Sequence, residues 1–318
     1  MREISIKKVF VVAFLTGLFL TSARVALCAE TWRIDGQGQW KQAQGSKEEE
    51  FLLRVAEVKK LVDEGKPGKV KKAAKQLKAD FPQIAGEDFN AFVAAEVLLA
   101  KGKLTDAVRG YNKLLDEYPK SALRDAALER QFQIATDFLA GRKKRLLPGI
   151  WVKSYDEGVK IMDKISDRAG SADIAKRAML AAVQSYESRR MFNEAYLKWS
   201  EIQTRFPTGQ TGRDALLGMA RNKYAAYRGP EYDGSGLISA KSYYENFRLR
   251  YPKDAQELKV DEILTKINEQ LAEKNLLIAR YYGRTGSAEP ANLYNQMIIG
   301  NWPNTKAAES ARETISKK

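Results

Sequence analysis

The sequence contains no histidine and a single cysteine, Cys28, among its 318 residues. Without histidine the chain cannot form a Ser-His-Asp triad, a histidine general base or a histidine-containing metal site. One cysteine excludes both an intramolecular disulfide and a zinc site built from several cysteines. Carboxylates are plentiful, with 40 Asp and Glu, but no catalytic motif surrounds them. We therefore expect a protein that is not an enzyme and that needs no cofactor.

The N-terminus has the pattern of an export signal. Lys7 and Lys8 precede an apolar run over residues 9–20, which matches the basic and hydrophobic regions of a signal peptide. The run is shorter than the about 20 apolar residues that a membrane-spanning helix needs. A polar stretch follows it, which disfavours a buried core helix. The sequence predicts a signal peptide over residues 1–29 and a flexible segment over 30–46.

Two cleavage patterns overlap at the end of this signal. An ordinary small-residue site would end at Ala29, whereas the segment Val25-Ala26-Leu27-Cys28 resembles a lipoprotein box. In a lipoprotein, Cys28 would carry the lipid and become the first mature residue. Leu27 is unusual for that pattern, because Gly, Ala or Ser ordinarily precedes the lipidated cysteine. Both interpretations of Cys28 stay open.

The chain carries an excess of positive charge, 54 Lys and Arg against 40 Asp and Glu. Loss of residues 1–29 would remove four basic residues and one acidic residue, which leaves 50 and 39 and a net charge of +11. In an exported protein this charge argues against nucleic acid as a partner. It favours acidic proteins or anionic lipid headgroups, or it is simply a solvated basic surface.

A repeated pattern runs through the rest of the chain. An aromatic residue directly precedes proline at five places, Phe81-Pro82, Tyr118-Pro119, Phe206-Pro207, Tyr251-Pro252 and Trp302-Pro303. Alanine stands twelve residues before four of these prolines, at Ala107, Ala195, Ala240 and Ala291, and an aromatic stands eight residues before three of them, at Tyr111, Trp199 and Tyr244. One unit without the proline keeps the frame, with Gly158 and Met162. The small residue allows two helices to approach closely, the aromatic one turn later fills the adjacent gap, and the proline ends the helix.

These marks predict an all-α, right-handed superhelix of tetratricopeptide-like helical hairpins over residues 47–318. About six hairpins are expected, with helices over 47–64 and 69–80, 88–101 and 105–117, 121–140 and 155–166, 173–189 and 193–205, 213–227 and 236–250, and 255–282 and 289–300. A capping helix over 305–316 would close the C-terminal end. No segment alternates as a strand would.

Two insertions interrupt the short turns of these hairpins, over residues 141–153 and 228–235. The first contains the four basic residues Arg142, Lys143, Lys144 and Arg145, followed by apolar residues that include Trp151. Long loops in compact repeats often serve a function. We expect this basic loop either to contact a fixed partner or to fold its apolar residues back on the core.

With the repeats in frame, the chain resembles the BamD family, the helical lipoproteins of the outer-membrane β-barrel assembly machinery. The resemblance covers residues 47–310 and includes the signal ending near Cys28, the number of units, and the segments Tyr118-Pro119-Lys120-Ser121, Phe206-Pro207-Thr208-Gly209 and Arg228-Gly229-Pro230-Glu231-Tyr232-Asp233. It implies a periplasmic scaffold at the inner face of the outer membrane, in lipid-anchored or peripheral contact with it. Its partners would be the barrel assembly protein and unfolded barrel clients. The alternative is a soluble periplasmic repeat protein that coordinates envelope constriction or cell-wall synthesis with the Tol–Pal system.

The repeat frame also predicts a binding surface, because the first helix of each stacked pair lines the concave side. It places Phe89, Phe92 and Glu96 on that side in the second unit, and Glu129, Arg130 and Gln133 in the third. Two exposed phenylalanines and an arginine would suit an extended peptide that ends in an aromatic residue and a carboxylate. The alternative is that Phe89 and Phe92 pack under the helix over 47–64.

Overall fold

A computed structural model describes residues 32–34, 40–42, 47–147 and 150–316. The chain divides into two compact units, Met1–Arg54 and Val55–Lys318. In the first unit, β1 (Trp32–Ile34) and β2 (Trp40–Gln42) form an antiparallel pair in which Arg33 lies opposite Lys41. This pairing falls in the segment that the sequence analysis expected to be flexible. Helix α1 (Lys47–Asp63) begins in this unit and continues into the second.

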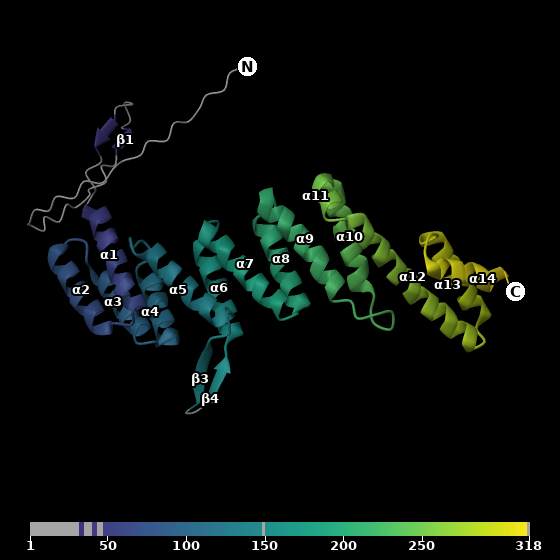
Figure 1. Ribbon diagram of the computed structural model, residues 1–318, viewed down its shortest axis with the longest axis horizontal. Helices are drawn as coiled ribbons and strands as arrows, with labels where there is room; N and C mark the ends of the chain where they lie inside the picture. The colour runs from purple at the N-terminus through teal and green to yellow at the C-terminus, as the bar shows by residue number, and fades with distance from the viewer. Residues whose placement is uncertain (1–31, 35–39, 43–46, 148–149, 317–318) are drawn as a thin grey trace, which may run out of the picture. The chain divides into compact units, whose positions relative to one another are not determined.

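The second unit is built from α-helices that follow one another in the order of the sequence (Figure 1). Helix α2 (Pro67–Asp80) follows α1. The helical pairs after it are α3 (Glu87–Ala100) with α4 (Leu104–Glu117), α5 (Arg124–Leu139) with α6 (Tyr155–Ala169), α7 (Asp173–Ser188) with α8 (Phe192–Arg205), α9 (Gly209–Ala225) with α10 (Ser235–Arg250), and α12 (Val260–Arg284) with α13 (Ala288–Asn301). Helix α14 (Lys306–Ser316) packs on α12 and α13. The predicted all-α superhelix of tetratricopeptide-like hairpins, with its C-terminal capping helix, is confirmed.

The aromatic-proline marks end helices as expected. Helices α2, α4, α8, α10 and α13 each stop directly before the aromatic residue, whose φ lies between −128° and −136° and whose ψ lies between 56° and 67°. Proline disfavours the helical conformation in the residue before it, which accounts for this shared geometry. The backbone N–H of each aromatic still donates to the carbonyl four residues earlier, so the last turn stays closed. Five helix ends were therefore readable from a dipeptide.

The small residues of the frame lie where paired helices meet. Ala107, Ala195 and Ala240 are fully buried. Tyr111 and Met162, which follow the small residue of their own pairs by four positions, are also fully buried. At Gly158 an added Cβ would lie 2.7 Å from a Leu139 side-chain atom and 2.9 Å from the Ala135 carbonyl oxygen. Only glycine therefore fits where α6 crosses α5, which explains the departure from alanine in this unit.

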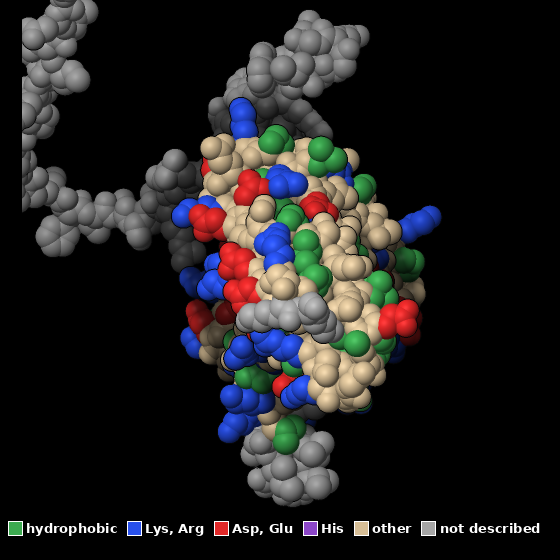
Figure 2. All heavy atoms as spheres, turned by 90° about the vertical axis from the view of Figure 1, so that its right-hand side faces the viewer, with side chains coloured by type: hydrophobic (Ala, Val, Ile, Leu, Met, Phe, Trp, Pro, Cys, Tyr) green, Lys and Arg blue, Asp and Glu red, His purple; other side chains and the backbone are tan. Residues whose placement is uncertain are grey.

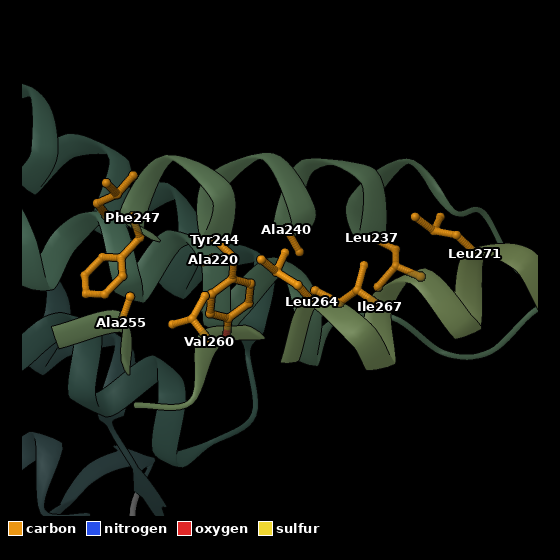
Figure 3. Close-up of a cluster of buried hydrophobic side chains, with 11 residues drawn as sticks. Ala220, Leu237, Ala240, Tyr244, Phe247, Ala255, Val260, Leu264, Ile267 and Leu271 are labelled. Carbon is orange, nitrogen blue, oxygen red and sulfur yellow. The ribbon is translucent and has the colours of Figure 1, made fainter. Parts of the chain in front are cut away.

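A core cluster of eleven buried residues lies at the junction of α9, α10, α11 and α12 (Figure 3). Leu237, Ala240, Tyr244 and Phe247 point from α10 towards residues of the following elements, among them Val260, Leu264 and Ile267 of α12. These α10 positions recur every three or four residues, which puts them on one face of the helix. The cluster joins the fifth pair to the sixth.

Two elements differ from the predicted ones. The expected long helix over 255–282 is divided into a short α11 (Pro252–Glu257) and α12, because Lys259 adopts a left-handed conformation with φ of 54°. The insertion over 141–153 contains β3 (Lys143–Leu147) and β4 (Ile150–Lys153), paired antiparallel. The expectation that no segment would form a strand was therefore wrong here, and also for β1 and β2. Cross-strand hydrogen bonds, which leave no strong pattern in segments this short, stabilise both pairs.

Candidate functional site

The residues predicted to line an N-terminal peptide groove are mostly buried. Phe89 and Phe92 are 2% and 1% exposed, and the Phe92 ring packs against Tyr111 of α4 with centroids 5.9 Å apart. Glu96 and Arg130 are also buried. The prediction that these four side chains are open to a peptide was wrong. Burial of a phenylalanine side chain between helices is favourable by itself, which accounts for their position. The alternative that both rings pack under the helix over 47–64 is confirmed as to burial, and the ring contact that the structure gives for Phe92 is with α4.

Arg130 is instead the centre of a buried polar network. Its Nε and Nη2 donate to the two oxygens of Glu96, each at 3.0 Å. Its Nη1 donates to Asp63 at 2.6 Å and to Gln133 at 2.9 Å, and Nη2 also donates to the Lys59 carbonyl at 2.9 Å. A guanidinium has five N–H donors. All five have acceptors within the protein, so none is left for a ligand carboxylate.

The pKa shifts around this network agree with its geometry. Burial disfavours the Arg130 charge, but the Glu96 carboxylate and the hydrogen bonds to Glu96 and Asp63 outweigh that effect and raise the pKa of Arg130. Burial, together with the adjacent Glu96 charge, raises the pKa of Tyr111 well above its ordinary value. The phenol therefore keeps its proton and donates a hydrogen bond to Glu96 at 2.6 Å. The network therefore joins the first helices α1, α3 and α5 to the second helix α4 as a structural element.

A related junction recurs two pairs later. Glu187 of α7 accepts hydrogen bonds from the Trp199 indole of α8 at 2.9 Å and from the Asn222 amide of α9 at 2.6 Å. Trp199 holds the same place in the repeat frame as Tyr111. In both junctions an acid on a first helix binds the aromatic of its own pair and a side chain from the first helix of the next pair. The sequence pattern identifies the aromatics, but it assigned Glu96 to a peptide groove and did not single out Glu187, because the two acids show no fixed offset from the prolines.

The other two predicted groove residues are accessible. Gln133 is exposed, although its side-chain oxygen accepts from Arg130. Glu129 is half-buried and forms a forked pair with Arg177 of α7, with two N–H···O distances of 3.1 Å. The Glu129 pair connects α5 to α7, whereas Gln133 bonds to Arg130 within α5.

The basic loop forms the start of the β3–β4 hairpin, which extends away from α5 and α6 (Figure 1). Arg142 and Lys143 are exposed, and Arg142 pairs with Asp137 at 3.3 Å. Lys144 and Arg145 lie in β3, where their backbones pair with Val152 and Trp151. Contact of this basic loop with a partner stays a prediction. Cys28 and the predicted signal peptide over residues 1–29 lie outside the described residues.

The second insertion is tied to the helix that follows it. Lys274 of α12 donates to the carbonyl oxygens of Pro230 at 3.2 Å and Tyr232 at 2.6 Å. The Arg228 guanidinium lies 4.6 Å from the centre of the Tyr232 ring. These contacts hold the loop against α12. The insertion therefore adds a contact between α12 and the segment that precedes α10.

A set of exposed apolar side chains lies on the second helices of the last pairs. Their side chains are 39% to 83% exposed, and they are Leu197 on α8, Ile238 and Leu249 on α10, and Leu293 and Met297 on α13. With about 100° of rotation per residue, the four residues other than Met297 lie roughly opposite the frame alanine of their own helix, and Met297 lies about 120° from it. We call these five residues the outward apolar face. Figure 2 shows the C-terminal end of the chain, where acidic and basic side chains alternate around apolar ones.

Within the described residues no cluster of three or more His, Cys, Asp or Glu could hold a metal ion. The helices of that same part of the chain include none that is long and apolar enough to cross a membrane.

No family model and no curated protein matches the sequence. Solved structures with a similar arrangement include the C-terminal part of a TPR repeat-containing protein from Cytophaga hutchinsonii, with a TM-score of 0.36, 16% identity, and coverage of 82% of this chain and 87% of that chain. A tetratricopeptide repeat protein from Parabacteroides merdae gives a TM-score of 0.32, 11% identity, and coverage of 83% and 96%. PilW, a type IV pilus biogenesis factor, gives 0.29, 16% identity, and coverage of 82% and 97%. At these scores, the fold assignment rests on the helical pairs themselves.

Proposed function

We propose that this protein is a non-enzymatic scaffold that binds other proteins in a bacterial cell envelope. The observation that carries the proposal is the outward apolar face. Five large apolar side chains exposed on three successive second helices are poorly placed for a chain with no partner. The helical hairpins hold them at fixed spacing, which suits the recognition of an extended protein surface.

Within this class we propose a role in outer-membrane β-barrel assembly, at the inner face of the outer membrane. Support comes from the sequence resemblance to the BamD family and from the export signal. The partners would be the barrel assembly protein and unfolded barrel clients. The exposed basic residues Arg142 and Lys143 offer a second, charged contact to an acidic partner or to anionic headgroups.

One feature of the sequence favours the alternative role with the Tol–Pal system. Leu27 fits a lipoprotein box poorly, whereas Ala29 completes an ordinary cleavage site. A chain cleaved after Ala29 would have no lipid anchor and would be free in the periplasm.

Crosslinking in intact cells followed by purification of the full chain tests the proposal. We expect the barrel assembly protein among the crosslinked partners, whereas recovery of Tol–Pal components in its place would select the alternative. The double variant Leu249→Ser and Leu293→Ser should reduce crosslinking several-fold, since apolar contact area is lost. Leu258→Ser is the matched control, because Leu258 is 49% exposed but follows α11, outside the outward apolar face. Equal crosslinking of all three proteins would overturn the assignment of this face.

A further inference from the structure

The last helical pair departs from the repeat frame at one position. Tyr111, Trp199 and Tyr244 each follow the frame alanine by one turn and are buried beside it. In the sixth pair the frame alanine is Ala291, and the residue four positions later is Asn295. A small amide therefore stands where the other proline-ended pairs from α4 onward carry a large aromatic ring.

A cavity of about 320 Å³ occupies the space that the missing ring leaves. It lies between α12, α13 and α14, and its walls are largely apolar and small, with Leu276, Ala279, Ala288 and Ala291 among them. Helix α14 packs against α12, in the place that the first helix of a next pair would take. In the second pair the ring of Tyr111 is fully buried at the frame position that Asn295 occupies in the sixth pair. The smaller Asn295 side chain leaves the cavity open.

Asn295 is unsatisfied at this cavity. The residue is only 2% exposed, and its Oδ1 accepts no hydrogen bond from any described residue. By contrast, Tyr111 donates to Glu96 and Trp199 donates to Glu187 from the same frame position. A buried amide oxygen without a donor costs about 1–3 kcal/mol. A ligand that hydrogen-bonds to Asn295 would recover this free energy.

The positive charge beside the cavity has no acidic partner in the described chain. Arg280 of α12 lines the cavity and is exposed, and it forms no ion pair with a described residue. It also lines an adjoining depression, together with Leu277, Gly283 and Arg284. The depression continues the site along α12 and adds a second arginine. Two neighbouring guanidinium groups favour a ligand with more than one carboxylate.

We propose that this C-terminal cavity binds an acidic peptide segment of a partner protein through one aromatic side chain. The ring would take the place of the aromatic that the sixth pair lacks, and a backbone amide beside it would bond to Asn295. Carboxylates flanking the aromatic residue would pair with Arg280 and Arg284. The inference rests on the proposed scaffold function and names the chemistry of one partner. Its site is separate from the outward apolar face.

Titration of the full chain with a short blocked peptide, acetyl-Gly-Asp-Phe-Asp-Gly-amide, tests the proposal by calorimetry. Comparison peptides replace Phe with Ala, or both Asp residues with Asn, and a third, acetyl-Gly-Gly-Phe with a free terminal carboxylate, tests a chain end as the source of the charge. We expect saturable binding of the first peptide and at least tenfold weaker binding of the first two comparisons. A free-terminus peptide that bound tighter than the acidic one would overturn the choice of an internal segment.

Variants of the protein separate a binding site from an incidental void. Asn295→Tyr restores the aromatic of the other pairs, and it should raise the melting temperature while weakening peptide binding at least tenfold. Arg280→Ala should weaken the acidic peptide about tenfold and leave the Asn-containing peptide unchanged. Lys266→Ala, on the same helix but away from the cavity, is the matched control and should bind normally.

Absence of saturable binding up to millimolar peptide, or unchanged binding by Asn295→Tyr, would overturn the proposal. If Asn295→Tyr does not fold, Ala279→Leu fills the same cavity from α12 and must give the same loss. Failure of these titrations would leave the crosslinking result through the outward apolar face intact, so the two proposals fail separately.

Discussion

At the scale of single residues, Arg130 shows how a side chain suited to ligand binding can serve packing. Its forked contact with Glu96 has the geometry expected for a carboxylate ligand, but the carboxylate belongs to the chain itself. Arg130 is among the largest fully buried side chains, and its partner Glu96 has no exposed surface. Removal of Arg130 leaves the buried Glu96 carboxylate without its cationic partner.

We therefore predict that Arg130→Ala destabilises the protein by about 3–5 kcal/mol. The measurement is chemical denaturation followed by far-ultraviolet circular dichroism. Arg177→Ala is the control, since it breaks an exposed forked pair with Glu129 and should cost no more than about 1 kcal/mol. Replacement of both Arg130 and Glu96 by apolar residues should restore much of the stability. Similar losses for Arg130→Ala and Arg177→Ala would contradict the importance of this network.

Tyr244 predicts how stability depends on alkaline pH. Burial raises the pKa of Tyr244 from 10.0 to about 12. Between these values the unfolded chain has lost the phenol proton while the folded chain retains it, so the folded state binds more protons. The protonated Tyr244 phenol contributes its full stabilisation below about pH 10. The free energy of unfolding then falls by about 2–3 kcal/mol as the pH rises towards the folded pKa.

The test compares the wild type with Tyr244→Phe, which keeps the ring and removes the titrating group. Melting temperatures between pH 9 and pH 12 should fall more steeply for the wild type than for the variant. Lysine titration affects both proteins alike, so it cancels in the comparison. Parallel curves would show that the buried phenol does not govern the alkaline loss.

At the scale of the helices, close contacts outweigh helix propensity. Gly218 lies within α9, where alanine would ordinarily stabilise a helix by about 1 kcal/mol. A Cβ at this position would lie 2.4 Å from two ring carbons of Trp199. That distance is far below contact, and both the indole and the backbone of α9 are held by the packing of the two helices.

We predict that Gly218→Ala lowers the melting temperature despite its better propensity, because overpacking costs about 1–3 kcal/mol. Thermal unfolding followed by circular dichroism measures the effect. Gly300→Ala is the matched control near the end of α13, where a Cβ would meet no atom within 4 Å. This control should be neutral or slightly stabilising. A stable Gly218→Ala protein would mean that α8 and α9 can separate without cost.

At the scale of the whole molecule, the proposed attachment to the membrane would be made by a lipid on Cys28. We predict from the resemblance to BamD lipoproteins that Cys28 becomes the lipidated first residue of the mature chain. The mass of the intact protein purified from its own membrane should then equal that of residues 28–318 plus acyl groups. A mature chain beginning at Glu30 without added mass would remove the lipid anchor and favour the soluble role with the Tol–Pal system.

The sequence alone determined where the helices end and which residues bring them together. A proline stops a helix and restrains the residue before it wherever it occurs, so the five aromatic-proline pairs specify helix ends locally. The buried alanines at 107, 195 and 240 follow from the same frame, because a fixed offset on a helix fixes the face. The break at Lys259 carried no such mark, because neither proline nor glycine stands there.

Only the tertiary structure decided which polar and aromatic side chains are accessible. The frame placed Phe89, Phe92 and Arg130 on first helices, but their exposure depends on what neighbouring helices place opposite them, and that partner is far away in sequence. Glu96 lies 34 residues from Arg130. Asn295 is the converse case, since the sequence shows a small residue at an aromatic position, while the cavity and the unpartnered amide exist only because α12, α13 and α14 leave that space unfilled. Periodicity fixes a side chain's direction, but packing decides what that side chain meets.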